Sequence, residues 1–242
     1  MILPDGSWLH GINDASVRIG LRLSKDETIV RTPFEVRHMG SKYPIFSFDF
    51  IGAKKGILPT SYDYLRLEGR MQYRLNLPPV GYSRLMLEGG KIFGKVPYLL
   101  LKLHEGNGTY FYDRYAFSCM NFYEFSSDAW ISFFYEHHFN GFLLGRVPLL
   151  KKLNWREVFV FKGVYGTLSA RNDGSLPNTK AVMLFPVGMS SVEHPYLETG
   201  FGIENIFRLL RVDCIWRLTH HRAVPGLSIP TFTVNFSLNL KF

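Results

Sequence analysis

Residues 231–242 read T-F-T-V-N-F-S-L-N-L-K-F, and this stretch decides the fold class. Apolar and polar side chains alternate along it without a break. Successive side chains of a β-strand point to opposite faces, so the pattern predicts a strand with two different faces. A transmembrane β-strand needs about 9–11 residues that are apolar towards lipid and polar on the other side. The stretch therefore predicts a strand of a transmembrane β-barrel.

The same alternation recurs along the rest of the chain. Residues 63–77 place Leu65, Leu67 and Met71 on one side and a row of charged side chains on the other, and that row must stay wet. Further strands are predicted at residues 14–24, 28–37, 43–51, 82–93, 113–125, 128–139, 155–168, 196–204 and 208–219. Pro33 removes a hydrogen-bond donor and marks residues 28–37 as an edge or bulged strand. We expect an all-β fold, an antiparallel transmembrane β-barrel of ten to twelve visible strands.

Composition supports this expectation. The chain has 242 residues, of which 46% are hydrophobic and 16% aromatic, yet its apolar residues are dispersed and form no run of about 18 that would predict a transmembrane helix. The net charge of +8 is compatible with anionic partners. Cys119 and Cys214 lie far apart and have neither metal-type nor disulfide-type spacing, so we expect both to fill strand positions.

The N-terminal residues M-I-L-P-D-G-S-W-L-H lack the basic and apolar regions of a signal peptide. For an outer-membrane protein this indicates that a signal was removed or that the chain is the C-terminal part of a longer protein. We expect one β-barrel domain over residues 1–242, truncated on its N-terminal side, with residues 1–13 as an irregular lead-in. An incomplete barrel would leave residues 14–37 as an unpaired edge.

One set of charged residues forms a candidate site. Eight arginines fall on the polar side of strands whose other side is apolar, and closure of a barrel would bring them to one lumen: Arg18, Arg22, Arg66, Arg70, Arg74, Arg84, Arg211 and Arg217. Glu68, Glu88 and Asp213 are partial counter-charges. Two interpretations stay open: an ion-paired ladder that braces the barrel, or an interior that attracts anions.

The other candidate sites are weaker. Adjacent His137 and His138 point to opposite faces of a strand and cannot chelate one metal, so no metal and no cofactor are expected. The G-F-G of residues 200–202 matches part of a dinucleotide motif but lies inside a predicted strand, where the motif needs a turn and a helix. The G-x-S-x-G motif of hydrolases is absent. A barrel hydrolase would have to use residues such as Ser118, Ser132 and His138.

Four segments carry a resemblance to a known family. They are N-F-Y-E-F at 121–125, F-Y-E-H-H-F-N-G at 134–141, R-V-P-L-L-K-K-L-N-W-R-E at 146–157 and G-F-G-I-E-N-I-F at 200–207. The chain resembles the C-terminal outer-membrane barrel of an uncharacterised Bacteroidetes family, in which the barrel usually follows a carboxypeptidase-regulatory-like domain. That barrel is distantly similar to the BamA and surface-antigen barrels, which also end on an aromatic residue. The resemblance implies a C-terminal assembly signal formed by Phe236, Leu238, Leu240 and Phe242.

The sequence thus predicts a non-enzymatic, integral outer-membrane β-barrel that acts in envelope transport, assembly or surface attachment. Its expected partners are outer-membrane lipid, the barrel assembly machinery and an anionic ligand in the lumen, and no nucleic acid. Two alternatives are a soluble β-barrel or sandwich that binds a lipid or glycan, and an outer-membrane barrel hydrolase.

Overall fold

The computed structural model of the chain describes residues 3, 6–7, 11–175, 181–192, 194–221 and 228–238, and only the backbone of residue 37. The strands of the described residues are β1 (Val17–Leu23), β2 (Thr28–Arg31), β3 (Val36–Gly40), β4 (Ile45–Ala53), β5 (Tyr64–Asn76), β6 (Tyr82–Gly94), β7 (Lys102–Leu103), β8 (Phe125–Ser127), β9 (Ala129–His138), β10 (Arg156–Thr167), β11 (Ser190–Ser191), β12 (Tyr196–Ile206), β13 (Leu210–Arg217) and β14 (Phe232–Leu238). The helices are η1 (Tyr98–Leu100), η2 (Leu144–Arg146) and α1 (Pro148–Lys151). None of these helices is long and apolar enough to cross a membrane.

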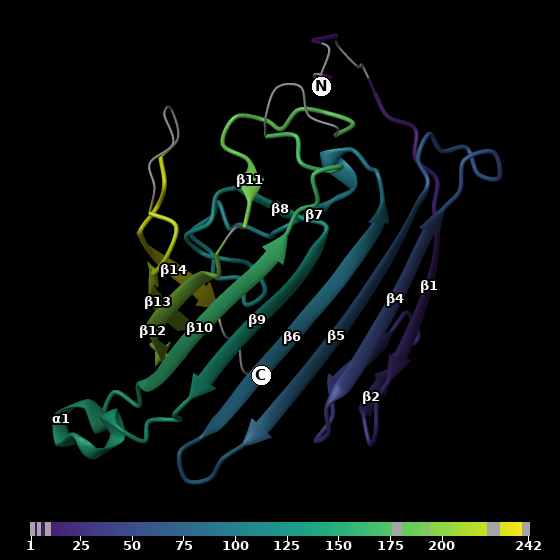
Figure 1. Cartoon of the computed structure of the whole chain (residues 1–242). Helices are drawn as coiled ribbons and strands as arrows, with labels where there is room; N and C mark the ends of the chain where they lie inside the picture. Colours follow the sequence, from purple (N-terminus) through teal and green to yellow (C-terminus); the bar gives the residue numbers. More distant parts are fainter. Residues whose placement is uncertain are drawn as a thin grey trace.

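Nine of the described strands form one curved antiparallel sheet in the order β1-β4-β5-β6-β9-β10-β12-β13-β14 (Figure 1). Each strand pairs with the next strand of the main sheet along the chain. The all-β, antiparallel fold predicted from the sequence is therefore confirmed. Within the described residues the sheet is open, with β1 and β14 at its two edges, and ten to twelve strands overstates its number.

Two predicted strands are wrong. Residues 113–125 form turns and irregular backbone, with only Phe125 in a strand. Their burial does not alternate, since the five consecutive residues 116–120 are buried while Phe122 and Tyr123 are exposed. Residues 28–37 do not join the main sheet. They divide between β2 and the start of β3, which form a separate two-stranded hairpin. The break falls around Pro33, where Thr32 and Glu35 close a turn through a backbone hydrogen bond of 2.9 Å.

The main sheet has two chemically different faces, which follow from the alternation and the strand register. One face, called here the outer face, exposes apolar side chains along all nine strands: Val17, Ile19, Leu21, Leu23, Phe46, Phe48, Phe50, Leu65, Leu75, Phe93, Ile131, Tyr165, Phe201, Trp216, Phe232, Phe236 and Leu238. Lys91 and Glu157, both close to a strand end, are the charged residues that the nine described strands place on it. The opposite, inner face carries the remaining charged residues of these strands.

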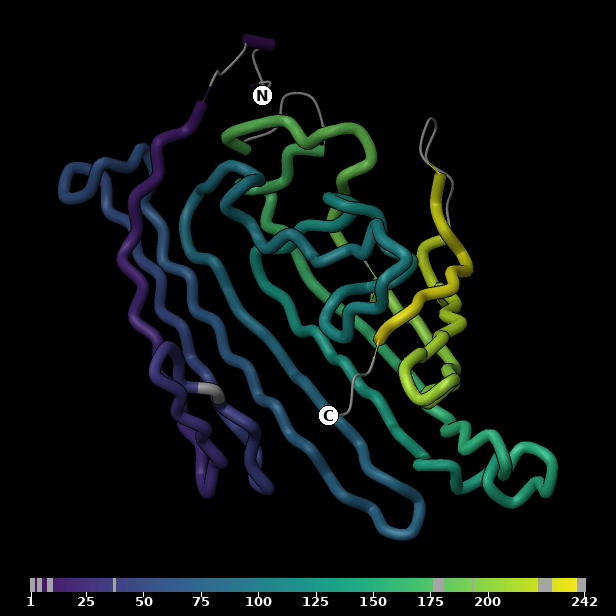
Figure 2. The backbone as a smooth tube through the Cα atoms, turned by 180° about the vertical axis from the view of Figure 1, so that it is seen from behind, coloured from purple at the N-terminus to yellow at the C-terminus, as the bar shows by residue number. Residues whose placement is uncertain are grey.

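The hydrophobic core lies on the inner face, between the sheet and the connections that cross it. One cluster joins Phe134 of β9 and Tyr196 of β12 to Phe117, Met120 and Val192 of the connections. A second cluster, around Ile92 and Trp130, packs near one end of β6 and β9. Figure 2 shows the sheet curving around the connection between β6 and β9. The apolar outer face is therefore not needed to form the core.

Glycines let inner-face side chains lie flat across β12. A Cβ atom at Gly202 would lie 2.2 Å from Oδ1 of Asp213, and one at Gly200 would lie 2.8 Å from the Ile215 side chain. Both glycines are inside an eleven-residue strand. The glycines thus serve close approach between neighbouring strands. They lie inside a strand, as the sequence predicts, and not in the turn before a helix that a dinucleotide motif needs.

Candidate functional site

The inner face of β9, β10, β12 and β13 carries charged side chains that are almost completely buried. Glu136 is 1% exposed, and Lys162, Glu198 and Asp213 are 0% exposed. They share one face because strand alternation and register bring them into adjacent positions. A buried charge is costly unless hydrogen bonds and opposite charges compensate it. Most of the compensation comes from residues 109–124, here called the inner segment.

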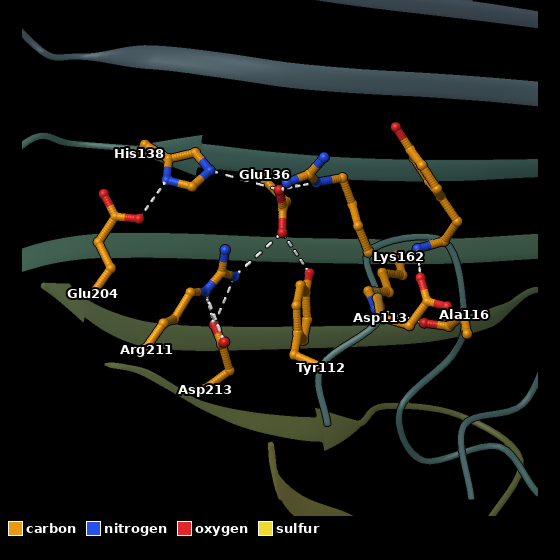
Figure 3. Close-up of polar contacts among 11 residues, drawn as sticks. Tyr112, Asp113, Ala116, Glu136, His138, Lys162, Glu204, Arg211 and Asp213 are labelled. Atoms are coloured by element: carbon orange, nitrogen blue, oxygen red, sulfur yellow. Dashed lines mark hydrogen bonds and ion pairs between the residues drawn. The ribbon is translucent and has the colours of Figure 1, made fainter. Parts of the chain in front are cut away.

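Glu136 is the centre of this network (Figure 3). Its carboxylate accepts hydrogen bonds from the Tyr112 hydroxyl at 2.6 Å and from Nε of Arg114 at 2.6 Å. Nη2 of Arg211 donates to it at 3.2 Å. Arg211 also binds Asp213 through two parallel hydrogen bonds of 2.7 and 2.8 Å. A tyrosine and an arginine of the inner segment and an arginine of β13 thus converge on one carboxylate.

His138 extends the network towards the end of β9. Its Nδ1 lies 3.2 Å from a carboxylate oxygen of Glu204, and its Nε2 lies 3.6 Å from Glu136. The ring also stacks on Tyr82, with centroids 4.5 Å apart. The His138 ring therefore lies between the carboxylates of Glu136 and Glu204 on the inner face and bridges them.

Lys162, on the inner face of β10, binds the backbone of the inner segment. Its Nζ donates to the backbone oxygens of Asp113 at 2.8 Å and Ala116 at 2.5 Å, and it lies 4.5 Å from the centroid of the Tyr112 ring (Figure 3). A fully buried ammonium that binds backbone carbonyls fixes the path of the chain above it.

Glu198 fixes the next residues of the inner segment. Its carboxylate accepts the backbone N–H groups of Ser118 at 2.8 Å and Cys119 at 2.7 Å, and the Tyr196 hydroxyl at 2.6 Å. The buried thiol of Cys119 lies beside it. Burial, followed by the charge of Glu198, raises the pKa of that thiol to about 12.

Arg217 closes the far end of the inner segment. Its guanidinium donates to Glu124 at 2.6 Å and to the backbone oxygens of Cys119 at 3.2 Å and His220 at 2.6 Å. The edge of the sheet contributes too, since backbone hydrogen bonds of 2.8 and 2.7 Å join Tyr112 and Tyr110 to Phe236 of β14. Side chains and backbone together anchor the inner segment across β9 to β14.

The structure places all eight predicted arginines on the inner face but divides them into two groups. Arg211 and Arg217 lie beneath the inner segment, and the other six lie on β1, β5 and β6. Six of the eight have carboxylate partners: Arg18 with Asp49, Arg22 with Glu27, Arg66 with Glu68, Arg70 with Glu88, Arg211 with Asp213 and Glu136, and Arg217 with Glu124. These six arginines are therefore placed as expected for a ladder of ion pairs that braces the sheet.

Arg74 and Arg84 differ from the other arginines. Their guanidinium carbons lie 4.2 and 5.3 Å from the centroid of the Tyr82 ring. Within the described residues neither has a carboxylate at ion-pair distance. They are the two members of the predicted cluster that form no ion pair with a carboxylate of the described residues.

The predicted hydrolase residues are not assembled. Ser132 and His138 are six positions apart on β9, a separation of roughly 20 Å along a strand. Ser118 approaches Glu198 through its backbone N–H and not through its hydroxyl. The sequence does not reveal a different pair, His104 and Ser127, which lie 2.9 Å apart. Both are buried, and burial lowers the pKa of His104 to about 3. Nδ1 of His104 meets no carboxylate in the described structure, so the pair lacks the third group of a triad.

The proposed assembly signal is described only in part. Phe236 and Leu238 lie on the outer face of β14 and are 39% and 65% exposed. Leu240 and Phe242 lie outside the described residues. Among the described residues no group of three or more His, Cys, Asp and Glu side chains is placed to hold a metal ion.

Comparison with known proteins identifies the family of the chain. A search of curated proteins finds no match. The family model described as the C-terminal domain of a family of unknown function (DUF5686) matches residues 12–170, which is more than half of the chain. The matched range runs from β1 to β10 and includes the inner segment. The chain therefore belongs to the DUF5686 family, in its C-terminal domain.

Proposed function

We propose that the chain forms the wall of an integral outer-membrane β-barrel and has no enzymatic activity of its own. The observation that carries this proposal is the division of the sheet into two faces. Exposed apolar side chains cover the outer face of all nine strands, while paired charges and the core lie on the inner face. A water-soluble monomer rarely exposes an apolar surface of that extent, whereas lipid requires one.

The strand lengths agree with this role. β4, β5, β6, β9, β10 and β12 have 9, 13, 13, 10, 12 and 11 residues, and a strand that crosses a bilayer needs about 9–11. The proposal requires that the edges at β1 and β14 are paired in the membrane, because unpaired backbone groups are not tolerated in lipid.

The filled interior narrows the cellular role. Along β9 to β13 the inner face is covered by the inner segment and its buried ion pairs. A wall closed in this way leaves no open channel on that side. Among the three envelope roles, assembly and surface attachment are therefore favoured over transport through this part of the interior. A soluble protein that binds lipid or glycan inside is supported less, since the chain itself fills that space.

Spin labels on neighbouring residues of β5 test the proposal. Met71 lies on the outer face and Gln72 on the inner face, so Met71→Cys and Gln72→Cys form a matched pair once both native cysteines are replaced by alanine. After reconstitution into liposomes, the label at residue 71 should collide with oxygen dissolved in lipid and be shielded from a water-soluble nickel chelate. The label at residue 72 should show the lower ratio of oxygen to nickel collisions. Equal nickel accessibility at the two positions would refute a membrane-embedded outer face.

A further inference from the structure

A cleft opens on the inner face beside the inner segment. It has a volume of about 550 Å³ and lies between the β2–β3 hairpin region and the ends of β5 and β6. Arg74 and Arg84 line its floor, and Arg114 and Tyr115 of the inner segment close one side. Arg22 of β1 also lines the cleft, so four arginines from four segments of the chain surround it.

Arg74 and Arg84 face each other directly in the register of β5 and β6. Like charges in directly opposed strand positions destabilise a sheet. The two guanidinium groups share the Tyr82 ring, and the described residues provide no carboxylate within ion-pair distance of either. Arg66 and Arg70, on the same face of the same strand, are paired with Glu68 and Glu88. The unfavourable pair of Arg74 and Arg84 therefore lies at the cleft.

Arg114 adds a third positive charge at the same place. Its Nε binds Glu136, the register partner of Arg84, and its side chain remains 34% exposed. The carboxylates that line the cleft are Asp26 and Glu27, and Glu27 is bound by Arg22 and His38. Positive charge consequently exceeds negative charge around Arg84.

We propose that Arg74, Arg84 and Arg114 form a binding site for the phosphate group of a phosphate ester, with Tyr82 as a flat support beneath the two strand arginines. A guanidinium group can donate two parallel hydrogen bonds to two phosphate oxygens. Lysine cannot form this paired arrangement, because its ammonium group acts as a point charge. A doubly charged phosphate matches three arginines of which one already shares a carboxylate. The cleft is larger than a phosphate and has room for the sugar or glycerol attached to it. This site does not depend on the proposed membrane location.

Titration calorimetry on the full chain in detergent tests the site. The probes are inorganic pyrophosphate, sn-glycerol 3-phosphate and a short-chain phosphatidic acid. Saturable binding of at least one probe is expected, and Arg74→Gln with Arg84→Gln should weaken it by about tenfold or more. Arg18→Gln is the matched control, because Arg18 lies on the same face but is paired with Asp49 and does not line the cleft. That variant should bind within about twofold of the unmodified chain.

The remaining outcomes also decide the question. A preference for phosphatidic acid over glycerol phosphate would assign the site to a lipid headgroup, and equal binding would assign it to a free phosphate ester. The double variant Arg74→Lys with Arg84→Lys keeps the charge and the fold but loses the paired donors, so intermediate affinity is expected. Absence of saturable binding by all three probes, or an equal loss in Arg18→Gln, would overturn the proposal.

Discussion

Glu136 shows how one residue can hold distant parts of the chain together. Its carboxylate is 1% exposed and receives hydrogen bonds from Tyr112, Arg114 and Arg211. None of these donors is close to it in sequence. Replacing the carboxylate by a neutral amide leaves the buried guanidinium of Arg211 close to that of Arg114, which is partly exposed. The free-energy cost therefore includes the repulsion between these two charges as well as the hydrogen bonds lost.

We expect Glu136→Gln to lower the free energy of unfolding by about 3–5 kcal/mol, the range measured when one partner of a buried ion pair is removed. Asp49→Asn is the control, because its partner Arg18 is 63% exposed and the pair should contribute at most about 1 kcal/mol. Urea unfolding monitored by tryptophan fluorescence measures both. A Glu136→Gln variant no less stable than the control would show that the network does not stabilise the fold.

Cys119 gives a prediction about pH at the same scale. Burial raises the pKa of its thiol from 9.0 to about 12. At pH 8 the folded chain should therefore react with iodoacetamide at Cys119 far more slowly than the urea-unfolded chain does. Between about pH 9 and 12 the unfolded thiol ionises first, so this group lowers stability as pH rises. Mass spectrometry of the alkylated peptides gives the rates, and equal rates at Cys119 in the folded and the unfolded chain would contradict the burial of residue 119.

At the scale of the element, alternation in the sequence predicts strands well wherever one side meets the apolar outer face. Residues 63–77 and 82–93 correspond to β5 and β6 within one residue at each end. Pro148 stands at the start of the short helix α1, the place in a helix where proline is tolerated. In these stretches apolar and polar residues alternate because successive side chains of one strand face the apolar outer face and the charged inner face in turn. This pattern can be read from the strand's own sequence.

The inner segment could not be predicted in this way, because its partners are remote. Its aromatic residues suggest a strand, yet Phe117 packs on Phe134 and Tyr196 and the backbone forms turns. Glu68, Glu88 and Asp213 are recognisable as counter-charges from their strands. The roles of Tyr112, Arg114 and Glu124 depend on the folded path of an irregular segment. An excess of carboxylates on predicted inner positions, at Glu136 and Glu198, is the signal that another segment must cover them.

We expect Glu198→Gln to loosen the inner segment while the sheet remains intact. The carboxylate accepts the N–H groups of Ser118 and Cys119, and a hydrogen bond to a charged group contributes about 1.5–3 kcal/mol. Amide exchange at residues 118 and 119 should therefore accelerate by about 10- to 100-fold. Amides in the centre of β5 and β6 serve as the internal control. Unchanged exchange at 118 and 119 would mean that other contacts suffice to hold the segment.

At the scale of the whole molecule, the chain separates its chemistry by face and not by region. The outer face is apolar from β1 to β14, and the inner face combines charge, core and cleft. The outer face of such a sheet is suited to contact with lipid. About half the width of its inner face is already covered by the inner segment. Further pairing can occur at the edge on β1. At the edge on β14 the backbone of Phe236 already bonds to the inner segment, which leaves only part of that edge for another strand.

Neighbouring residues of β4 test the two faces in the assembled protein. Phe48 lies on the outer face, while Ser47 lies on the inner face near Asp49, Glu68 and Glu88. We expect Phe48→Arg to block membrane assembly, since an arginine facing lipid near the midplane costs about 2–4 kcal/mol. Ser47→Arg should assemble, because the inner face does not meet lipid, and because Asp49, Glu68 and Glu88 lie close enough to offset the charges of its register partners Arg22 and Arg70. Heat-modifiable migration in gels reports the folded fraction, and equal shifts for the two variants would contradict the assignment of faces.

The anchoring of the inner segment has a consequence for the order of events during synthesis. Ser118 is separated from Glu198 by 80 residues, Cys119 from Arg217 by 98 and Thr109 from Asn235 by 126. The segment leaves the ribosome before most of the groups that will hold it. Contacts of such long range form late and slow folding. A nascent chain that ends before β13 consequently displays Glu136 without Arg211 and Glu124 without Arg217, and it must be kept from aggregation until its last strands arrive.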